Sequence, residues 1–300
     1  MGYLFFAISR FGMLVRGYCG KKSSALIDGF KDATSANVLR MTLCVLMGVA
    51  ILLVNGDISG LAASRDTILI GAVCGISTAV GVIVWMVSLK YRAYMLMDVF
   101  GSVGVVVPLI FGQILFHESI SLVQWFGYLL IIIAAWVMMS YNTSIKGTMS
   151  TGAFIILVLH GLSSGIIELC QKMFAMSNSG DSISVFNIYT YFFAGIILFV
   201  LYFIFKRNSP REQTEKSHII PKGVFKYIFI MSVALFGASY FNTKAAELLS
   251  SVQLFPLNQG AMLVCSSLMA SIFFKEKITH KCVIGIIMVF MGLIIINFAK

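Results

Sequence analysis

Polar side chains that could bind a proton or a solute lie inside one long apolar stretch of the sequence. They recur at every fourth position, as His160, Ser164, Glu168 and Lys172, and this spacing places them along one side of a helix. A charge near the centre of a membrane helix costs about 2.5–3.5 kcal/mol on insertion scales, so it should face protein or water. Glu168 could meet a cationic substrate group, or release a proton in one conformation and recover it in another. The alternative is a structural pair between Glu168 and Lys172.

Other polar and charged residues inside apolar stretches are candidates for the walls of a binding site. They are Arg10, Trp85, Asp98, Tyr240, Asn242, Lys244, Glu247, Asn258 and Gln259. Arg10 and Lys244 could bind an anionic substrate group or neutralise Glu168. Lys244 could instead pair with Glu247, three residues further along the same helix face. Trp85 could form a stacking wall, and each neutral residue could alternatively form interhelical hydrogen bonds.

The residue pattern does not favour an enzyme or a metal site. The sequence has no H-E-x-x-H motif, no clustered nucleophile and base, and no Walker A motif for ATP. Its six cysteines include no C-x-x-C pair, and most lie in apolar segments where thiols pack as small hydrophobes. We therefore predict no catalytic residue, no metal and no cofactor.

Two glutamates, Glu118 and Glu276, stand at equivalent places between apolar stretches. A carboxylate at such a boundary can stabilise the start of the following helix, so a structural role is predicted for both. Ser121 and Gln124 also match the S-x-x-Q capping box.

A G-x-x-x-G motif is formed by Gly161 and Gly165. Small residues at this spacing let two membrane helices approach closely. The motif therefore predicts helix packing rather than substrate contact.

Composition identifies the elements that must hold these residues as membrane helices. The 300 residues are 59% hydrophobic and 11% charged, with a mean hydropathy of +0.95, whereas soluble domains carry roughly a quarter charged residues. Residues 123–140 and 183–205 contain no charge, and each stretch is about long enough to cross a bilayer. The net charge of +10 does not indicate nucleic-acid binding, because the basic residues lie between apolar runs as the positive-inside rule predicts.

Apolar stretches and polar breaks predict ten transmembrane helices in an all-α integral membrane protein. They are expected near 2–18, 37–55, 67–89, 93–116, 122–140, 150–171, 183–205, 224–248, 251–274 and 280–298. The first is the weakest candidate, since it is short and carries Arg10 and Arg16. The polar segment Lys206–Lys222 is expected to be a solvated loop.

The two halves of the chain repeat. Residues 118–121 (ESIS) and Gly127 are matched by residues 276–279 (EKIT) and Gly285, with the same offset of 158 positions. Since each half holds five predicted helices, an odd number, the second half must be inverted in the membrane relative to the first. We predict two inverted five-helix repeats, residues 1–145 and 146–300. Such repeats support alternating access in transporters; the alternative is a duplicated bundle that is stable without transporting anything.

With these features the chain resembles a ten-helix member of the drug/metabolite transporter superfamily, of the EamA type. The resemblance covers nearly the whole chain. It rests on the glutamate that ends the fourth helix of each unit, the short turn after it, the glycine-bearing fifth helix, and the segment Ser88–Tyr91 at the end of the third helix. It implies export or exchange of metabolites, amino acids or drugs. Small multidrug transporters of this superfamily also use a glutamate in the first helix of their unit, and Glu168 stands in the first helix of the second unit.

We therefore predict a multi-pass protein of the cell membrane that moves a small-molecule substrate through a site between its two halves, near the bilayer midplane. Its surroundings are the lipid bilayer, and no nucleic-acid partner is expected. The residues predicted for substrate or proton coupling are Glu168, His160, Ser164, Arg10, Lys244, Trp85, Asn258 and Gln259. The alternatives are a non-transporting membrane scaffold or sensor and, less favoured, an intramembrane enzyme.

Overall fold

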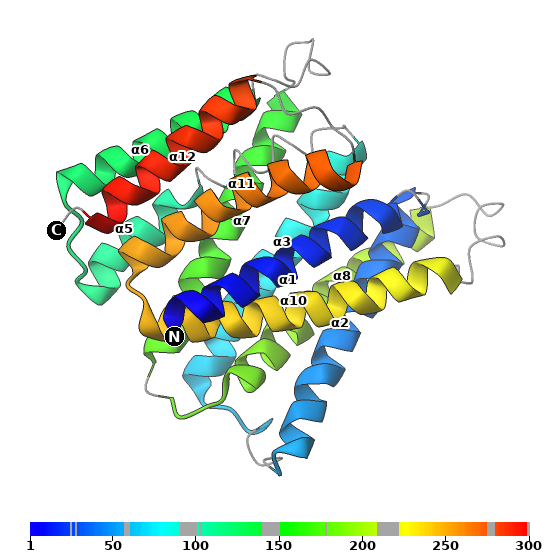
Figure 1. Ribbon diagram of the computed structural model, residues 1–300. Coiled ribbons are helices and arrows are strands. Elements are labelled where there is room, and N and C mark those ends of the chain that lie inside the picture. Colours follow the sequence, from blue (N-terminus) through cyan, green and yellow to red (C-terminus); the bar gives the residue numbers. More distant parts are fainter. Residues whose placement is uncertain are drawn as a thin grey trace.

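The computed structural model describes residues 1–24, 26–27, 29–56, 61–90, 101, 104–139, 151–177, 179–208, 222–274 and 280–298. Within these residues the chain forms ten α-helices and no strand (Figure 1). Asp98, Glu276 and the predicted boundary between the halves, residues 141–149, lie outside the described residues.

The helices follow the apolar stretches of the sequence closely. They are α1 (Gly2–Ser24), α2 (Gly29–Val54), α3 (Arg65–Lys90), α5 (Val106–Phe116), α6 (Leu122–Met139), α7 (Thr151–Met176), α8 (Ile183–Asn208), α10 (Lys222–Leu248), α11 (Ser251–Phe274) and α12 (His280–Phe298). α2 begins at Gly29 rather than near residue 37, and α5 begins at Val106, with most of the earlier part of the predicted span 93–116 outside the described residues. Hydropathy marks the apolar core of a helix, whereas its hydrogen bonding continues into the polar residues before that core.

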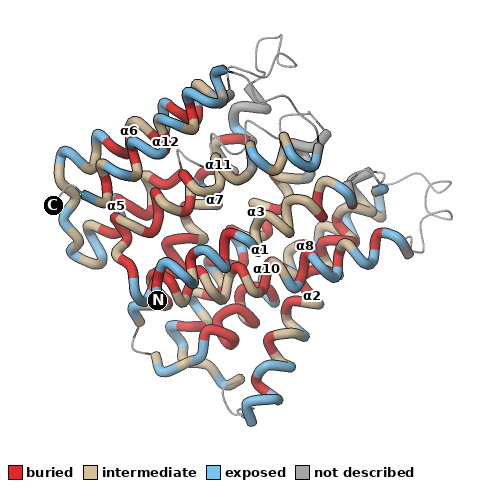
Figure 2. Tube along the Cα trace, in the orientation of Figure 1, coloured by how far each residue is buried: buried red, intermediate tan, exposed pale blue. Residues whose placement is uncertain are grey.

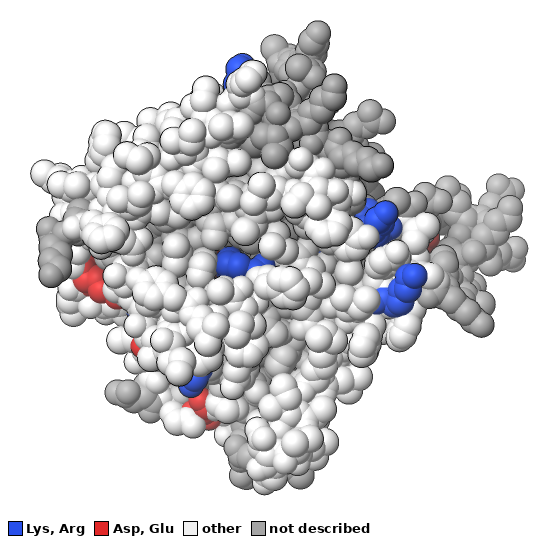
Figure 3. All heavy atoms as spheres, in the orientation of Figure 1, with Lys and Arg blue, Asp and Glu red and all other residues white. Residues whose placement is uncertain are grey.

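The outer surface of the bundle is apolar. Five helical segments in the described residues are long and apolar enough to cross a membrane, namely Lys31–Val54, Arg65–Trp85, Ile155–Met176, Ile183–Arg207 and Gly223–Leu248. Large apolar side chains such as Phe199 on α8 and Phe290 on α12 are exposed, while buried positions follow the helix sides that face neighbouring helices (Figure 2). Charged side chains are sparse on the face shown in Figure 3. An exterior of this kind suits hydrocarbon, and the predicted all-α membrane fold is confirmed.

Helices from the two halves pack in reciprocal pairs. α1 packs along α10 and α3 along α7, while α2 packs along α8 and α6 along α12 (Figure 1). In the predicted repeats, the pairs α1–α10 and α3–α7 each join the first helix of one half to the third helix of the other. The pair α2–α8 joins the two second helices, and the pair α6–α12 joins the two fifth helices. Exchanging the two halves leaves this set of pairs unchanged, as a twofold relationship requires. The first three helices of each half therefore meet one another around the centre of the bundle.

α7 makes a close backbone approach to Gly104, just before α5. A Cβ atom added to Gly165 would overlap the carbonyl oxygen of Gly104, and one added to Gly104 would overlap the backbone of Gly161. The G-x-x-x-G motif of α7 is therefore a packing surface, as predicted. This contact holds α7, with its stripe of polar residues, against the first half of the chain.

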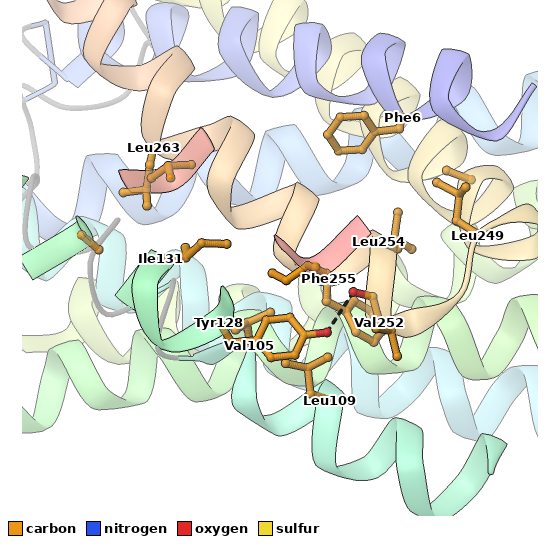
Figure 4. Close-up of a cluster of buried hydrophobic side chains, with 14 of the residues drawn as sticks. Phe6, Val105, Leu109, Tyr128, Ile131, Leu249, Val252, Leu254, Phe255 and Leu263 are labelled. Atoms are coloured by element: carbon orange, nitrogen blue, oxygen red, sulfur yellow. Dashed lines mark hydrogen bonds between the residues drawn. The ribbon is translucent and has the colours of Figure 1, made fainter. Parts of the chain in front are cut away.

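Pro256 interrupts the backbone hydrogen bonds of α11, and a side chain of α6 supplies the missing partner. Proline has no N–H, so the carbonyl of residue 252, four positions earlier, lacks its usual helical donor. The Tyr128 hydroxyl donates to the Val252 carbonyl at 2.9 Å (Figure 4). The bond lies in a cluster of buried apolar side chains that joins α5, α6 and α11, including Leu109 and Phe255. It anchors the part of α11 that precedes residues 258 and 259.

Tyr128→Phe is expected to lower the free energy of unfolding by about 1 kcal/mol, because the Val252 carbonyl then lacks a donor inside an apolar cluster. Thermal unfolding of the purified protein in detergent measures the change. Tyr202→Phe is the matched control, since no hydrogen bond of the Tyr202 hydroxyl is found within the described residues. Equal melting temperatures for the two variants would contradict the role of this bond.

Two charged side chains hold the junction between α10 and α11. The Lys172 ammonium donates to the carbonyls of Ala246 and Leu249, at 2.9 and 2.8 Å, where α10 ends. One carboxylate oxygen of Glu118 accepts the N–H groups of Ser251 and the next residue, at 2.8 and 3.3 Å, where α11 begins. The other oxygen lies 3.9 Å from the ammonium. A cation at a C-terminal helix end and an anion at an N-terminal end both match the helix dipoles.

The start of α6 has the predicted capping box. The Ser121 N–H donates to the Gln124 side-chain oxygen at 2.9 Å, and the Gln124 N–H donates to the Ser121 hydroxyl at 3.2 Å. The expectation that Glu118 serves the helix following it is wrong in one respect. Its carboxylate stabilises the start of α11, because tertiary packing brings that helix end beside it.

Glu118→Gln is expected to lower the melting temperature and the folded yield, with little change in substrate preference. The amide keeps an acceptor for the α11 N–H groups but loses the charge opposite the buried Lys172. Glu247→Gln is the matched control, because it removes a carboxylate whose lysine partner is 40% exposed, and exposed pairs contribute little. A Glu118→Gln protein with normal yield and no transport would overturn the structural assignment.

Candidate functional site

A cavity of about 210 Å³ lies where the first three helices of the two halves meet. Its walls come from α1, α2 and α3 in the first half and from α7, α8 and α10 in the second. The polar and aromatic lining residues are Arg10, Arg16, Arg40, Thr78, Trp85, His160, Ser163, Ser164, Glu168, Gln171, Tyr191, Ser239 and Asn242. Drug-sized ligands usually occupy pockets of roughly 300–1,000 Å³. The volume here suits a small solute.

Glu168 is the only carboxylate among the described residues that line this cavity. Its side chain is 8% exposed, and one oxygen accepts a hydrogen bond from the Gln259 amide at 3.1 Å. The other oxygen is buried and has no hydrogen-bond partner within the described residues. Asn258 is fully buried beside the carboxylate but forms no hydrogen bond of good geometry with it. This second oxygen can accept a proton or a hydrogen bond.

Three arginines reach the cavity from α1 and α2. Arg10 donates to the side-chain oxygens of Asn242 and Ser9, at 3.0 and 3.1 Å, and it interacts electrostatically with Glu168. Arg16 lies six residues along α1 from Arg10, and Arg40 comes from α2. In the described part of the lining, three guanidinium groups thus stand against one carboxylate.

A chain of hydrogen bonds connects the walls of the cavity. Arg10 donates to the Asn242 carbonyl oxygen, and the Asn242 amide donates to the Gln171 oxygen at 2.6 Å. The Gln171 amide donates to the Ser239 hydroxyl at 3.1 Å, and that hydroxyl donates to the Asn187 oxygen at 2.8 Å. These bonds run through α1, α10, α7 and α8. They fix the orientation of the amide groups and join the first half of the chain to the second.

Five of the eight residues predicted for the site line this one cavity. They are Glu168, His160, Ser164, Arg10 and Trp85. Gln259 reaches the site through its hydrogen bond to Glu168, and Asn258 is its buried neighbour on α11.

Lys244 does not line the cavity. It forms an ion pair of 2.8 Å with Glu247, at positions that are 40% and 30% exposed, which is the alternative weighed for it from the sequence. Lys172 belongs to the polar stripe of α7, but its ammonium engages Glu118 and the end of α10 instead of Glu168.

Sequence reasoning missed several lining residues, above all Arg40, Arg16 and Gln171. Arg40 lies inside the predicted span 37–55, and a charge inside a span should face protein or water. That signal alone could have selected it. Gln171 carried no such signal, because a single glutamine beside the end of a span is common at interhelical contacts.

The described residues contain no group of three or more His, Cys, Asp and Glu side chains that could hold a metal ion. The polar groups of the cavity suit binding of a solute or a proton.

Comparisons with known proteins agree with this architecture. Residues 151–298 match the model of the EamA-like transporter family. No similar protein was found among the curated proteins. One solved crystal structure of a protein aligns over 98% of this chain and 95% of its own, with a TM-score of 0.74 and 12% sequence identity. At that identity the likeness concerns the fold alone.

The structural likeness extends over nearly the whole chain, and the family match covers the half that carries Glu168. The resemblance to the drug/metabolite transporter superfamily is thereby confirmed. The chain is a helical membrane protein whose residues 151–298 match the model of the EamA-like transporter family.

Proposed function

We propose that this protein is a secondary transporter that exports or exchanges a small solute across the cell membrane through the central cavity. The observation that carries the proposal is the position of Glu168. It is a buried carboxyl group, one oxygen of which has no partner among the residues that the structure describes, in a small cavity lined by the first three helices of both halves. An intramembrane carboxyl group of this kind is a functional candidate by default.

The packing of the helices supports alternating access as the mechanism. Reciprocal pairs join the halves, so rocking of one half against the other would open the cavity to one side and then to the other. The hydrogen bond from Arg10 to Asn242 crosses that interface, and the bond from Asn242 to Gln171 continues the chain within the second half. A solute or proton that changes these bonds would bias the two conformations.

The test is solute counterflow in proteoliposomes. Candidate solutes are first selected by thermal shift from a panel of amino acids, carboxylic acids and cationic drugs, because a bound ligand stabilises the folded state. Preloaded vesicles of the wild-type protein are expected to accumulate the labelled form of a stabilising solute. Absence of counterflow with every stabilising solute would favour a scaffold or sensor.

Two variants of α7 localise the pathway. Ser164→Trp fills the cavity, whereas Leu162→Trp places the same bulk on an exposed apolar position of the same helix. Counterflow should be lost in the first variant and kept in the second. Equal counterflow in both would place the pathway elsewhere.

A further inference from the structure

We propose that the transported solute carries an anionic group, a carboxylate or a phosphate, which Arg40 and Arg16 hold in the cavity. This inference rests on the proposed function and adds the chemical class of the substrate.

The first argument is the state of Arg40. It lies within an apolar segment of α2, lines the cavity and is 5% exposed. Its Nε atom is buried without a hydrogen-bond partner, and no carboxylate pairs with its guanidinium within the described part of the chain. A buried charge without a counter-ion is costly in a membrane protein. An anion from outside the chain would supply the missing partner.

The second argument is the charge balance of the cavity. Among the described residues, three guanidinium groups line it together with the single carboxylate of Glu168. Arg10 interacts with Glu168, and Arg16 lies close enough to both Arg10 and Arg40 to interact electrostatically with them. Like charges repel more strongly at low dielectric than in water. A bound anion would relieve this repulsion and would be attracted by the field of the cavity.

The third argument is chemical fit. A guanidinium group offers a planar fork of N–H donors that matches carboxylate and phosphate oxygens. Nδ1 of His160, across the cavity on α7, is also buried without a partner within the described residues. The cavity volume of about 210 Å³ excludes bulky anions. The expected substrate is thus a small organic anion.

The test compares probes of similar size and different charge. Succinate and glycerol phosphate are the anionic probes, alanine is the zwitterion, and choline is the cation. We expect one of the two anions to raise the melting temperature of the wild-type protein and to support counterflow, and which one does so distinguishes a carboxylate from a phosphate group. Counterflow of choline or alanine, without any effect of either anion, would overturn the inference while leaving the transporter proposal intact. No counterflow with any probe or with the larger panel would count against the transporter itself.

Variants of Arg40 test the assigned residue. Arg40→Gln is expected to weaken binding of the active anion by at least about tenfold, the loss of a charged hydrogen bond. Arg40→Lys should retain part of the affinity, and Lys244→Gln, which removes a cation outside the cavity, should retain all of it.

The ligand-free stability of Arg40→Gln separates a binding role from a structural one. Because the variant removes a buried charge that has no counter-ion among the described residues, its melting temperature without ligand should equal or exceed that of the wild type. A large drop in melting temperature, or failure to fold, would mean that Arg40 is a structural residue and would overturn the proposal. Unchanged anion affinity would overturn it as well.

Discussion

Glu168→Gln should leave the protein folded and abolish transport driven by a pH gradient. Glutamine keeps the shape of the side chain and an oxygen that can accept the Gln259 hydrogen bond, which is 3.1 Å long in the structure. It cannot bind or release a proton. If protonation of Glu168 is linked to solute movement, the gradient-driven rate should fall by at least about tenfold, a typical size for coupling between two linked sites.

The surroundings of Glu168 make this prediction specific. The charged and titratable groups that face the cavity with it are Arg10 and Arg16 from α1, Arg40 from α2, His160 on its own helix and Tyr191 from α8. The Lys172 ammonium is engaged by Glu118 and by two carbonyl groups at the end of α10. Lys172 therefore does not form the ion pair that would keep Glu168 ionised and make it a purely structural residue.

The measurement is solute flux in proteoliposomes with imposed pH differences of either sign. Glu247→Gln is the control, because it removes a carboxylate of α10 that pairs with Lys244 outside the cavity. That variant should show wild-type pH dependence. If Glu168→Gln transports at the wild-type rate with unchanged pH dependence, Glu168 is a packing residue and the coupling group lies elsewhere.

Gly165→Ala should destabilise the protein far more than the same substitution at Gly237. The added methyl group at position 165 would overlap the carbonyl oxygen of Gly104, a backbone atom that can move only if the whole segment moves. Overpacking of this kind costs about 3 kcal/mol at the upper end of its usual range. At Gly237, in the middle of α10, no atom of the described residues lies within 4 Å of the added carbon, apart from the nearby backbone of the helix itself. There the substitution should be neutral or stabilising, since alanine favours helix by about 0.5–1 kcal/mol over glycine.

Thermal unfolding and the monodisperse yield in detergent compare the two glycine variants. A large loss is expected for Gly165→Ala, with yield near wild type for Gly237→Ala. Equal behaviour would mean that α7 and Gly104 are not in close backbone contact. The position of Glu168 in the cavity would then also need revision, because this contact places α7 against the first half.

Local pattern was enough to predict the helices. The ends of α6, α8, α10, α11 and α12 lie within three residues of the predicted ends. Length, apolarity and polar breaks are properties of neighbouring residues, and a bilayer requires every spanning segment to satisfy its own backbone hydrogen bonds. The Ser121–Gln124 capping box and the packing role of Gly165 were predictable for the same reason. Each depends on residues a few positions apart.

For the polar stripe on α7, the sequence alone predicted residues of the candidate site. His160, Ser164 and Glu168 share one helix side because of their spacing, and the cost of a buried charge predicts that this side faces protein or water. The structure places all three on the cavity. The sequence could not predict that Lys172 pairs with Glu118 rather than with Glu168, because Glu118 lies 54 positions earlier in the chain.

By itself, then, the sequence determined the membrane class and the helices, which follow from composition and short spacings, and it predicted the repeat and the candidate glutamate. Only the tertiary structure showed which side chains these polar and charged residues contact. It brought Gln259 of α11 to Glu168, gathered Arg40 with Arg16 and Arg10 around one small cavity, and left Lys244 paired outside it. The physical reason is that helix packing brings together side chains far apart in the chain, and it depends on close backbone fits such as that between Gly165 and Gly104. Hydropathy shows that a charge must avoid lipid, and only the packed bundle shows what that charge meets.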